Sequence, residues 1–149
     1  MVNFEQLFRE SGGKPIVYDG RPVCLVDEIS LPTGFSLELA FESASGVYRQ
    51  GVALKADGPL AVGAASSPHI LLWRDTAPDS VVVHIGKGTT KVSVYNVWDH
   101  GDGVTQAWHN GAAMIVEHLD AGARRYRCND GEPDDDFDDI VFRIRPLAA

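Results

Sequence analysis

The chain has 149 residues, of which 44% are hydrophobic and 23% charged, and its 13 basic and 21 acidic residues give a formal net charge of −8. This length suits one domain with a buried hydrophobic core, and we expect that domain to span residues 1–149. A general nucleic-acid-binding function is disfavoured, because phosphate recognition requires an excess of lysine and arginine on some face.

The N-terminal residues predict a short helix. Asn3 can cap it, Phe4, Leu7 and Phe8 would share one face, and Gly12-Gly13 would end it. The first ten residues lack the basic start and apolar run of a secretory signal, and no apolar run approaches the ~20 residues of a membrane span. We therefore expect a cytoplasmic protein without a membrane partner.

After this helix the hydrophobic pattern changes to a period of two, which is typical of half-buried strands. In Ser36–Glu42, for example, Leu37, Leu39 and Phe41 fall on one side of the strand and two glutamates on the other. Similar segments recur along the chain at short spacing. The predicted strands are Val23–Ile29, Ser36–Glu42, Val47–Lys55, Ile70–Arg74, Val81–Ile85, Lys91–Trp98, Ala112–Leu119, Arg124–Cys128 and Ile140–Arg145.

Gly, Pro, Asn and Asp residues separate these segments and predict turns, among them Asp57-Gly58-Pro59. Asn110-Gly111 is the strongest predicted hairpin turn, because a type I′ turn needs positive φ at both central residues. About nine short strands with such turns indicate an all-β fold, and we expect an antiparallel β-sandwich of jelly-roll or C2-like character. Cys24 and Cys128 are interpreted as two buried free thiols, with one long-range disulfide as the alternative.

The negative charge is concentrated in one segment, since seven of the ten residues from Asp130 to Asp139 are acidic. Removing these seven charges from the total of −8 leaves −1. Carboxylates packed this closely raise one another's pKa unless a cation neutralises them, and hard oxygen ligands in an irregular loop suit Ca²⁺. The predicted metal ligands are Asn129, Asp130, Asp134, Asp136, Asp138 and Asp139.

Two other interpretations of the acidic loop need no metal. Nearby arginines could pair with its carboxylates, or the loop could simply be solvated. The arginines that flank it are Arg124, Arg125, Arg127, Arg143 and Arg145. The segment does not follow the EF-hand spacing. Phe137 lies inside the run, and the strand Ile140–Arg145 follows it directly, so both would hold the last carboxylates against the fold.

The segment Asp134–Phe142 resembles the acidic D-x-D-[FY]-[ND]-D-hydrophobic motif near the C-terminus of some bacterial β-sandwich modules thought to bind calcium. The similarity is confined to this segment and indicates no family for the whole chain. It implies that Asp134, Asp136, Asp138 and Asp139 are ligand positions and that Phe137 is a buried aromatic.

A second cluster of candidate residues lies around a glycine-rich turn between Tyr95 and Gly111. Carbohydrate recognition uses aromatic rings for the CH face of the sugar and polar side chains for its hydroxyls. The predicted ligand-binding residues are Trp98, Asp99, Asp102, Trp108 and Asn110. Trp98 also shares a strand face with Val92 and Val94, which favours core packing for this residue.

The five histidines allow an enzymatic alternative. They are His69, His84, His100, His109 and His118. Three of them converging on one sheet face would hold a transition metal, but the sequence has no HxH pair with a following glutamate. The nucleophile elbow, the HExxH motif, the P-loop and the dinucleotide fingerprint are also missing.

The leading hypothesis is therefore a non-enzymatic binding module. The acidic loop 129–139 would hold Ca²⁺ as a cofactor and order the neighbouring loops, which would bind a carbohydrate or a protein. The alternatives are a small metal-dependent enzyme that uses His and Asp on a sheet face, and an acidic cytoplasmic interaction or inhibitor protein whose carboxylates contact a basic partner.

Overall fold

The fold of the chain was analysed in a computed structural model, which describes residues 4–32, 34–108, 111–131 and 136–148. These residues form a helix, α1 (Phe4–Glu10), a short 3₁₀ turn, η1 (Asp120–Gly122), and eleven strands. The strands are β1 (Ile16–Tyr18), β2 (Arg21–Val23), β3 (Asp27–Ser30), β4 (Ser36–Ser43), β5 (Arg49–Val62), β6 (Ala65–Trp73), β7 (Ser80–Ile85), β8 (Lys91–Asp99), β9 (Ala113–His118), β10 (Arg124–Asn129) and β11 (Ile140–Leu147).

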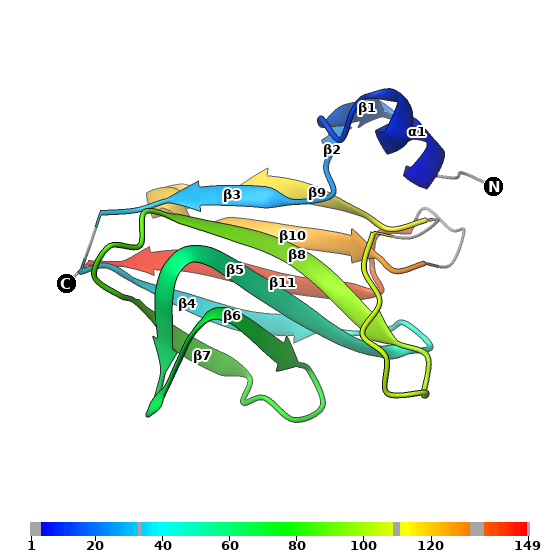
Figure 1. The fold of residues 1–149 in the computed structure, drawn as a ribbon. Coiled ribbons are helices and arrows are strands. Elements are labelled where there is room, and N and C mark those ends of the chain that lie inside the picture. Colours follow the sequence, from blue (N-terminus) through cyan, green and yellow to red (C-terminus); the bar gives the residue numbers. More distant parts are fainter. Residues whose placement is uncertain (1–3, 33, 109–110, 132–135, 149) are drawn as a thin grey trace.

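Nine of these strands form one antiparallel sheet, so the predicted all-β class is confirmed. The order in the sheet is β3-β8-β5-β7-β4-β11-β10-β9, and β6 pairs with β5 beside this path (Figure 1). The sheet curls, and its two ends come together near the start of β3. There the backbone N–H of Cys24 donates to the Met114 carbonyl of β9 at 2.9 Å, and Met114 donates back at 2.8 Å.

Strand β5 changes its pairing partner part-way along its length. Its first part, Arg49–Ala56, pairs with β8, whereas Leu60 and Ala61 pair with β7, and the register against β6 shifts between Lys55 and Leu60. The turn predicted at Asp57-Gly58-Pro59 is therefore wrong. These residues form an irregularity inside one long strand. Because the hydrogen-bond ladder is interrupted there, the missing backbone N–H of Pro59 removes no ladder hydrogen bond.

The main core fills the inside of the curled sheet. The alternation read from Ser36–Glu42 is confirmed, because Leu37, Leu39 and Phe41 are all buried. They pack with inward residues of the neighbouring strands, including Phe142 of β11 and Val83 of β7. These strands therefore direct alternate apolar side chains into the core, as expected for an antiparallel sheet whose other face is exposed to solvent.

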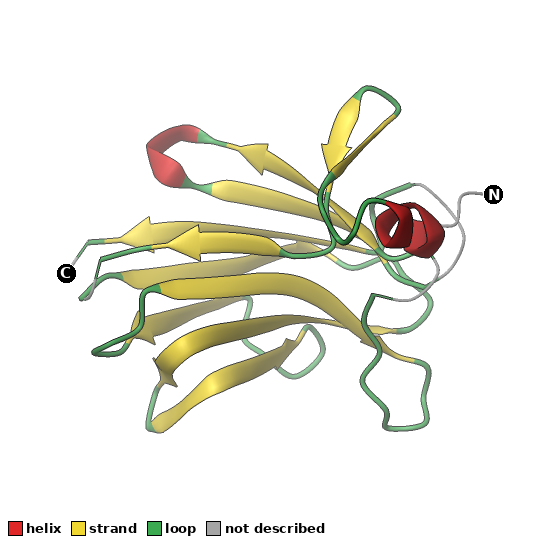
Figure 2. Ribbon diagram, turned by 45° about the horizontal axis from the view of Figure 1, so that its top comes forward, coloured by secondary structure: helices red, strands yellow, loops and turns green. Residues whose placement is uncertain are grey.

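A second, smaller core lies outside the sheet at one end. Figure 2 shows α1 outside the strands at this end, while η1 lies at the opposite end of the molecule. Phe4 and Phe8 of α1 pack against Ala113 and Ile115 of β9 and against Phe137. The predicted helix is thus present, with Leu7 at 36% exposure on the edge of its buried face. Its cap, Asn3, is outside the described residues.

Two pairings differ from the sequence-based expectation. Asp19 and Gly20, both with positive φ, join β1 and β2 in a hairpin that the predicted strands did not include. The hairpin predicted at Asn110-Gly111 is wrong for the strands that flank it, because β8 pairs with β3 and β5 and β9 pairs with β10. The chain after β8 instead returns through a bridge between Trp98 and Gln106.

Candidate functional site

The candidate ligand site is a hollow of about 410 Å³ on the outer face of the sheet, which we call the Trp108 hollow. Strands β3, β5 and β8 supply most of its wall, and Trp108 closes one side from the loop that follows β8. The residues that line it are Val26, Glu28, Lys55, Ala56, Asp57, Lys91, Ser93, Tyr95 and Trp108.

Two aromatic rings form one wall of this hollow. The ring centroids of Tyr95 and Trp108 are 4.6 Å apart, with an angle of 43° between the planes. Tyr95 is 8% exposed, and its burial raises the pKa of the phenol. Trp108 is 44% exposed. The inner ring thus supports the outer one, which presents apolar surface to solvent.

The backbone of Trp108 has a φ of 63°, in the left-handed region. This region is unfavourable for a bulky side chain and costs on the order of 1–3 kcal/mol, so it persists only where neighbouring contacts enforce it. Backbone strain of this kind is concentrated at functional sites. At Trp108 the left-handed backbone coincides with the ring contact to Tyr95.

Charged and polar groups surround the aromatic wall. The Lys91 ammonium lies 3.5 Å from Oε1 of Glu28. Asp57 accepts hydrogen bonds from the Thr90 hydroxyl and from the backbone N–H groups of Thr90 and Lys91. These bonds, the Thr90 hydroxyl first, lower the pKa of Asp57 to about 2. Its carboxylate therefore stays charged and fixed at the rim, while Lys55 forms no ion pair with a described residue.

The predicted ligand-binding residues fall in different places. Trp108 lines the hollow, but Trp98 is only 1% exposed and its indole N–H donates to Nε2 of His100 at 3.1 Å. Trp98 is therefore a core residue, as its position on the strand face of Val92 and Val94 favoured. Asp99 and Asp102 lie outside the hollow lining and stabilise their own loop, and Asn110 is outside the described residues.

The loop after β8 is held by its aspartates. Oδ1 of Asp99 accepts the backbone N–H groups of Gly101 at 2.7 Å and Gly103 at 3.2 Å, which lowers the pKa of Asp99. Oδ1 of Asp102 accepts the N–H of Val104 at 3.0 Å. Both carboxylates therefore act as turn-forming acceptors.

The acidic loop begins and ends inside the protein. Asn129, Asp130 and Asp139 are 0%, 1% and 7% exposed. The backbone N–H of Asp130 donates to Oδ2 of Asp139 at 2.9 Å, and the N–H of Phe137 donates to Oδ1 of Asn129 at 2.7 Å. Asn96 on β8 donates from Nδ2 to the Asn129 carbonyl at 2.8 Å. These bonds join the two ends of the loop to each other and to the sheet.

The structure separates the predicted metal ligands into two groups. Asp136 and Asp138 are exposed, whereas Asn129, Asp130 and Asp139 are buried, and Asp134 is outside the described residues. Phe137, between the two exposed aspartates, is 2% exposed, as the sequence predicted. Its backbone has a φ of 55°, and the centroid of its ring lies 5.7 Å from that of Phe4 in α1.

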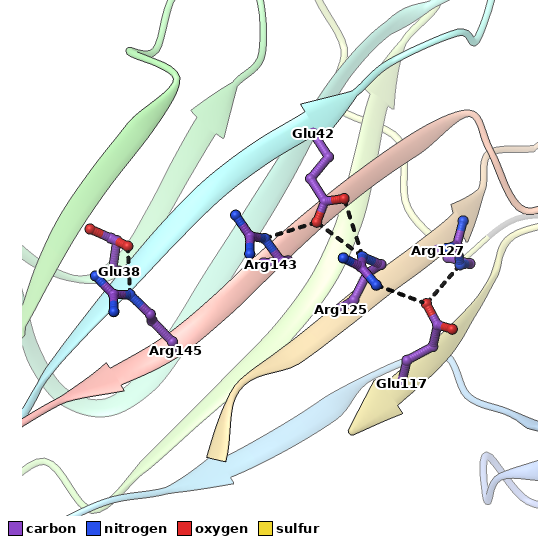
Figure 3. A network of polar contacts seen from close by, with 7 residues as sticks. All are labelled: Glu38, Glu42, Glu117, Arg125, Arg127, Arg143 and Arg145. Carbon is purple, nitrogen blue, oxygen red and sulfur yellow. Dashed lines mark hydrogen bonds and ion pairs between the residues drawn. The ribbon is translucent and has the colours of Figure 1, made fainter. Parts of the chain in front are cut away.

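Among the described residues, the ion pairs of the arginines that flank the loop go to glutamates of neighbouring strands and to Asp27. None of them goes to a described carboxylate of the loop, and residues 132–135 are outside the described residues. Figure 3 shows the resulting ladder on the outer face of β4, β11, β10 and β9. Its members are Glu38, Glu42, Glu117, Arg125, Arg127, Arg143 and Arg145.

Glu42 lies at the centre of this Arg-Glu ladder. Its Oε2 is 3.0 Å from Nε of Arg125 and 2.9 Å from Nε of Arg143. Long charged side chains lie on adjacent strands at this outer face, and like charges in such positions would repel one another. The Arg–Glu pairs place opposite charges next to each other instead.

The described histidines do not converge. His69 lies on β6, His84 on β7, His100 after β8 and His118 on β9, and all four are exposed. Over the described ranges, no three His, Cys, Asp or Glu side chains form a group that could hold a metal ion. His109 is outside those ranges.

Both cysteines are free thiols, so the disulfide alternative is wrong. Cys128 is fully buried and Cys24 partly so. Burial, followed by the charge of Asp27, raises the pKa of Cys24 to about 12. Burial likewise raises the pKa of Cys128. Neither thiol is thus activated as a nucleophile.

Comparison with protein-family models, with curated proteins and with solved structures gives no match to this chain. The resemblance of Asp134–Phe142 to a calcium-binding motif stays a prediction. In the part of the chain that the structure describes, no helix has the length and apolar character needed to cross a bilayer.

Proposed function

We propose that this protein is a non-enzymatic binding module and that it binds a saccharide in the Trp108 hollow. The observation that carries the proposal is the exposed, left-handed Trp108 held against Tyr95. An apolar ring face of this kind complements the CH face of a sugar ring. The volume of about 410 Å³ falls in the range of about 300–1,000 Å³ common for small-molecule sites.

The polar groups around the rings support a polyhydroxylated ligand. Asp57 supplies a fixed acceptor, Lys55 and Lys91 supply donors, and Ser93 can do either. A sugar presents hydroxyls in several directions and can use both kinds of partner. A purely apolar ligand would displace water from these groups without replacing its hydrogen bonds, which is costly.

The scaffold meets the mechanical need of such a site. Ser93 and Tyr95 come from one strand and Lys55 from its hydrogen-bonded neighbour, so their spacing is set by the ladder between β8 and β5. Sites built on strands are held more precisely than sites on loops. The jelly-roll or C2-like sandwich remains a prediction, and binding on this wall requires only the all-β scaffold.

The proposal is tested by titrating the full chain with soluble oligosaccharides of four kinds: neutral β-glucans, xylans, amino-sugar oligomers and uronic-acid oligomers. Binding is followed by calorimetry and by tryptophan fluorescence. We expect at least one class to bind and Trp108→Ala to weaken it tenfold or more, about 1.4 kcal/mol.

Trp73→Phe is the matched control, because Trp73 is another partly exposed tryptophan that lies outside the hollow. It should leave the affinity unchanged. Thermal melts of Trp108→Ala show whether the fold is retained. Saccharide binding that survives Trp108→Ala would contradict a site in the Trp108 hollow. No binding by any of the four classes would contradict the saccharide proposal and favour a protein ligand.

A further inference from the structure

Polar side chains on the adjacent strands β6, β5, β8 and β3 form one row at the Trp108 hollow. Lys55 of β5 is paired with His69 of β6 on one side and with Ser93 of β8 on the other, and Ser93 is paired in turn with Glu28 of β3. Residues directly opposite each other in antiparallel strands share one face of the sheet. The row therefore crosses the outer face from His69 to Glu28.

The negative charges of the hollow already have partners. Oε1 of Glu28 lies 3.5 Å from the Lys91 ammonium. The Asp57 carboxylate accepts hydrogen bonds from the Thr90 hydroxyl and from the backbone N–H groups of Thr90 and Lys91. Both carboxylates are thus held in place without any contribution from Lys55.

The Lys55 ammonium is the positive charge of the hollow that has no anionic partner among the described residues. Its cross-strand neighbours His69 and Ser93 carry no negative charge, and each can donate a hydrogen bond, from a ring N–H and from a hydroxyl. Hydrogen bonds between an ammonium and an anion are roughly twice as strong as those between neutral groups. This side of the hollow is therefore suited to an anionic group of the ligand.

Tyr95 connects the aromatic wall to this cationic side. Its hydroxyl lies 3.4 Å from Nε2 of His69, so the phenol reaches from β8 across β5 to β6. The residue opposite Tyr95 on β5 is Ala53, whose methyl group leaves room for this path. The same phenol ring packs against Trp108, with 4.6 Å between the centroids. One oligosaccharide can therefore stack a sugar ring on Trp108 and direct a charged substituent toward Lys55.

We propose that the saccharide bound in the Trp108 hollow carries one anionic substituent and that Lys55 binds this group, with His69 and Ser93 as neighbouring donors. The inference rests on the saccharide site proposed above and names its ligand class, an acidic oligosaccharide. The lining holds two lysines and two carboxylates, Glu28 and Asp57, so it has no net charge. This balance favours a single anionic group over a dense polyanion, which the two carboxylates would repel.

The proposal is tested by calorimetry of the full chain with oligosaccharides that carry one uronic-acid residue. Each is compared with the same compound after reduction of its carboxylate to a hydroxymethyl group, and with that reduced compound carrying one sulfate ester. We expect an anionic form to bind about tenfold more tightly than the neutral form. The stronger of the two anionic forms identifies the substituent as carboxylate or sulfate. In 0.5 M NaCl the preference for the anionic form should shrink, because the contact is open to solvent.

Two lysine variants locate the contact. Lys55→Gln removes the charge at similar length, so it should lower the affinity for the anionic compound to that for the neutral one and leave the neutral affinity unchanged. The unchanged neutral affinity shows that the site is still folded. Lys14→Gln is the matched control, because Lys14 is an exposed lysine outside the hollow. It should retain the full preference for the anionic form.

The outcomes separate this inference from the proposed function. Equal affinity for the anionic and neutral compounds would overturn the inference and leave the saccharide site in place. An unchanged preference in Lys55→Gln would show that Lys55 is not the contact. Failure of every compound to bind would overturn the saccharide site and this inference together.

Discussion

Replacing Phe137 with alanine should destabilise the protein strongly, because this one ring connects the acidic loop to the outer core. The ring is 2% exposed, lies 5.7 Å from that of Phe4 at an angle of 64°, and has the Arg21 guanidinium 5.8 Å from its centroid. Removing a buried phenylalanine side chain costs about 3–5 kcal/mol, and the loss of an edge-on aromatic pair accounts for about 0.5–1.5 kcal/mol of that.

Urea unfolding followed by far-UV circular dichroism and by tryptophan fluorescence measures this cost. For a chain of this length, 3–5 kcal/mol corresponds to a fall in melting temperature of roughly 6–20 °C. Phe137→Leu is the control, because it keeps most of the apolar volume and should cost less than about 1.5 kcal/mol. A cost below 1 kcal/mol for Phe137→Ala would refute the role of this ring as the anchor of the loop.

Two further predictions concern charges on the sheet. The pKa of Asp57 in the folded protein is about 2, below its ordinary value of 3.8. The stability that this group contributes is therefore present above about pH 4 and is lost as the pH falls toward 2. The Asp57→Asn variant should not show this loss of stability on acidification, and an acid transition identical to that of the wild type would contradict the prediction. Glu42→Gln should cost about 1 kcal/mol or less, because it weakens both arginine contacts of a partly exposed network, and 0.5 M salt should shrink the difference in urea midpoints. A cost that is independent of salt would argue against an electrostatic origin.

The strands were largely predictable because their information is local. In β4 the buried Leu37, Leu39 and Phe41 alternate with Glu38, Ala40 and Glu42, and this period of two indicates which side chains enter the core. The choice of partner strand is not local. Asn110-Gly111 has the composition of a hairpin turn, yet β8 and β9 lie far apart in the sheet order because β9 pairs with β10.

The candidate sites show the same contrast between local sequence information and contacts that only the fold creates. Charge density identified the acidic loop, but the division of its residues into buried and exposed depends on Phe137 meeting α1 and on Asn129 binding the loop backbone. Lys55, Lys91 and Ser93 of the Trp108 hollow were missed, because the sequence does not show that β5 and β8 are neighbouring strands.

The proposed saccharide site is tested most directly by two-dimensional NMR of the tryptophan indole N–H groups during titration with the oligosaccharide that binds. Trp108 presents its ring to the hollow, whereas the indole of Trp98 is buried and bonded to His100. We predict that the Trp108 indole signal moves with the ligand concentration while that of Trp98 stays in place. A titration that moves Trp98 or Trp73 and leaves Trp108 unchanged would contradict the account.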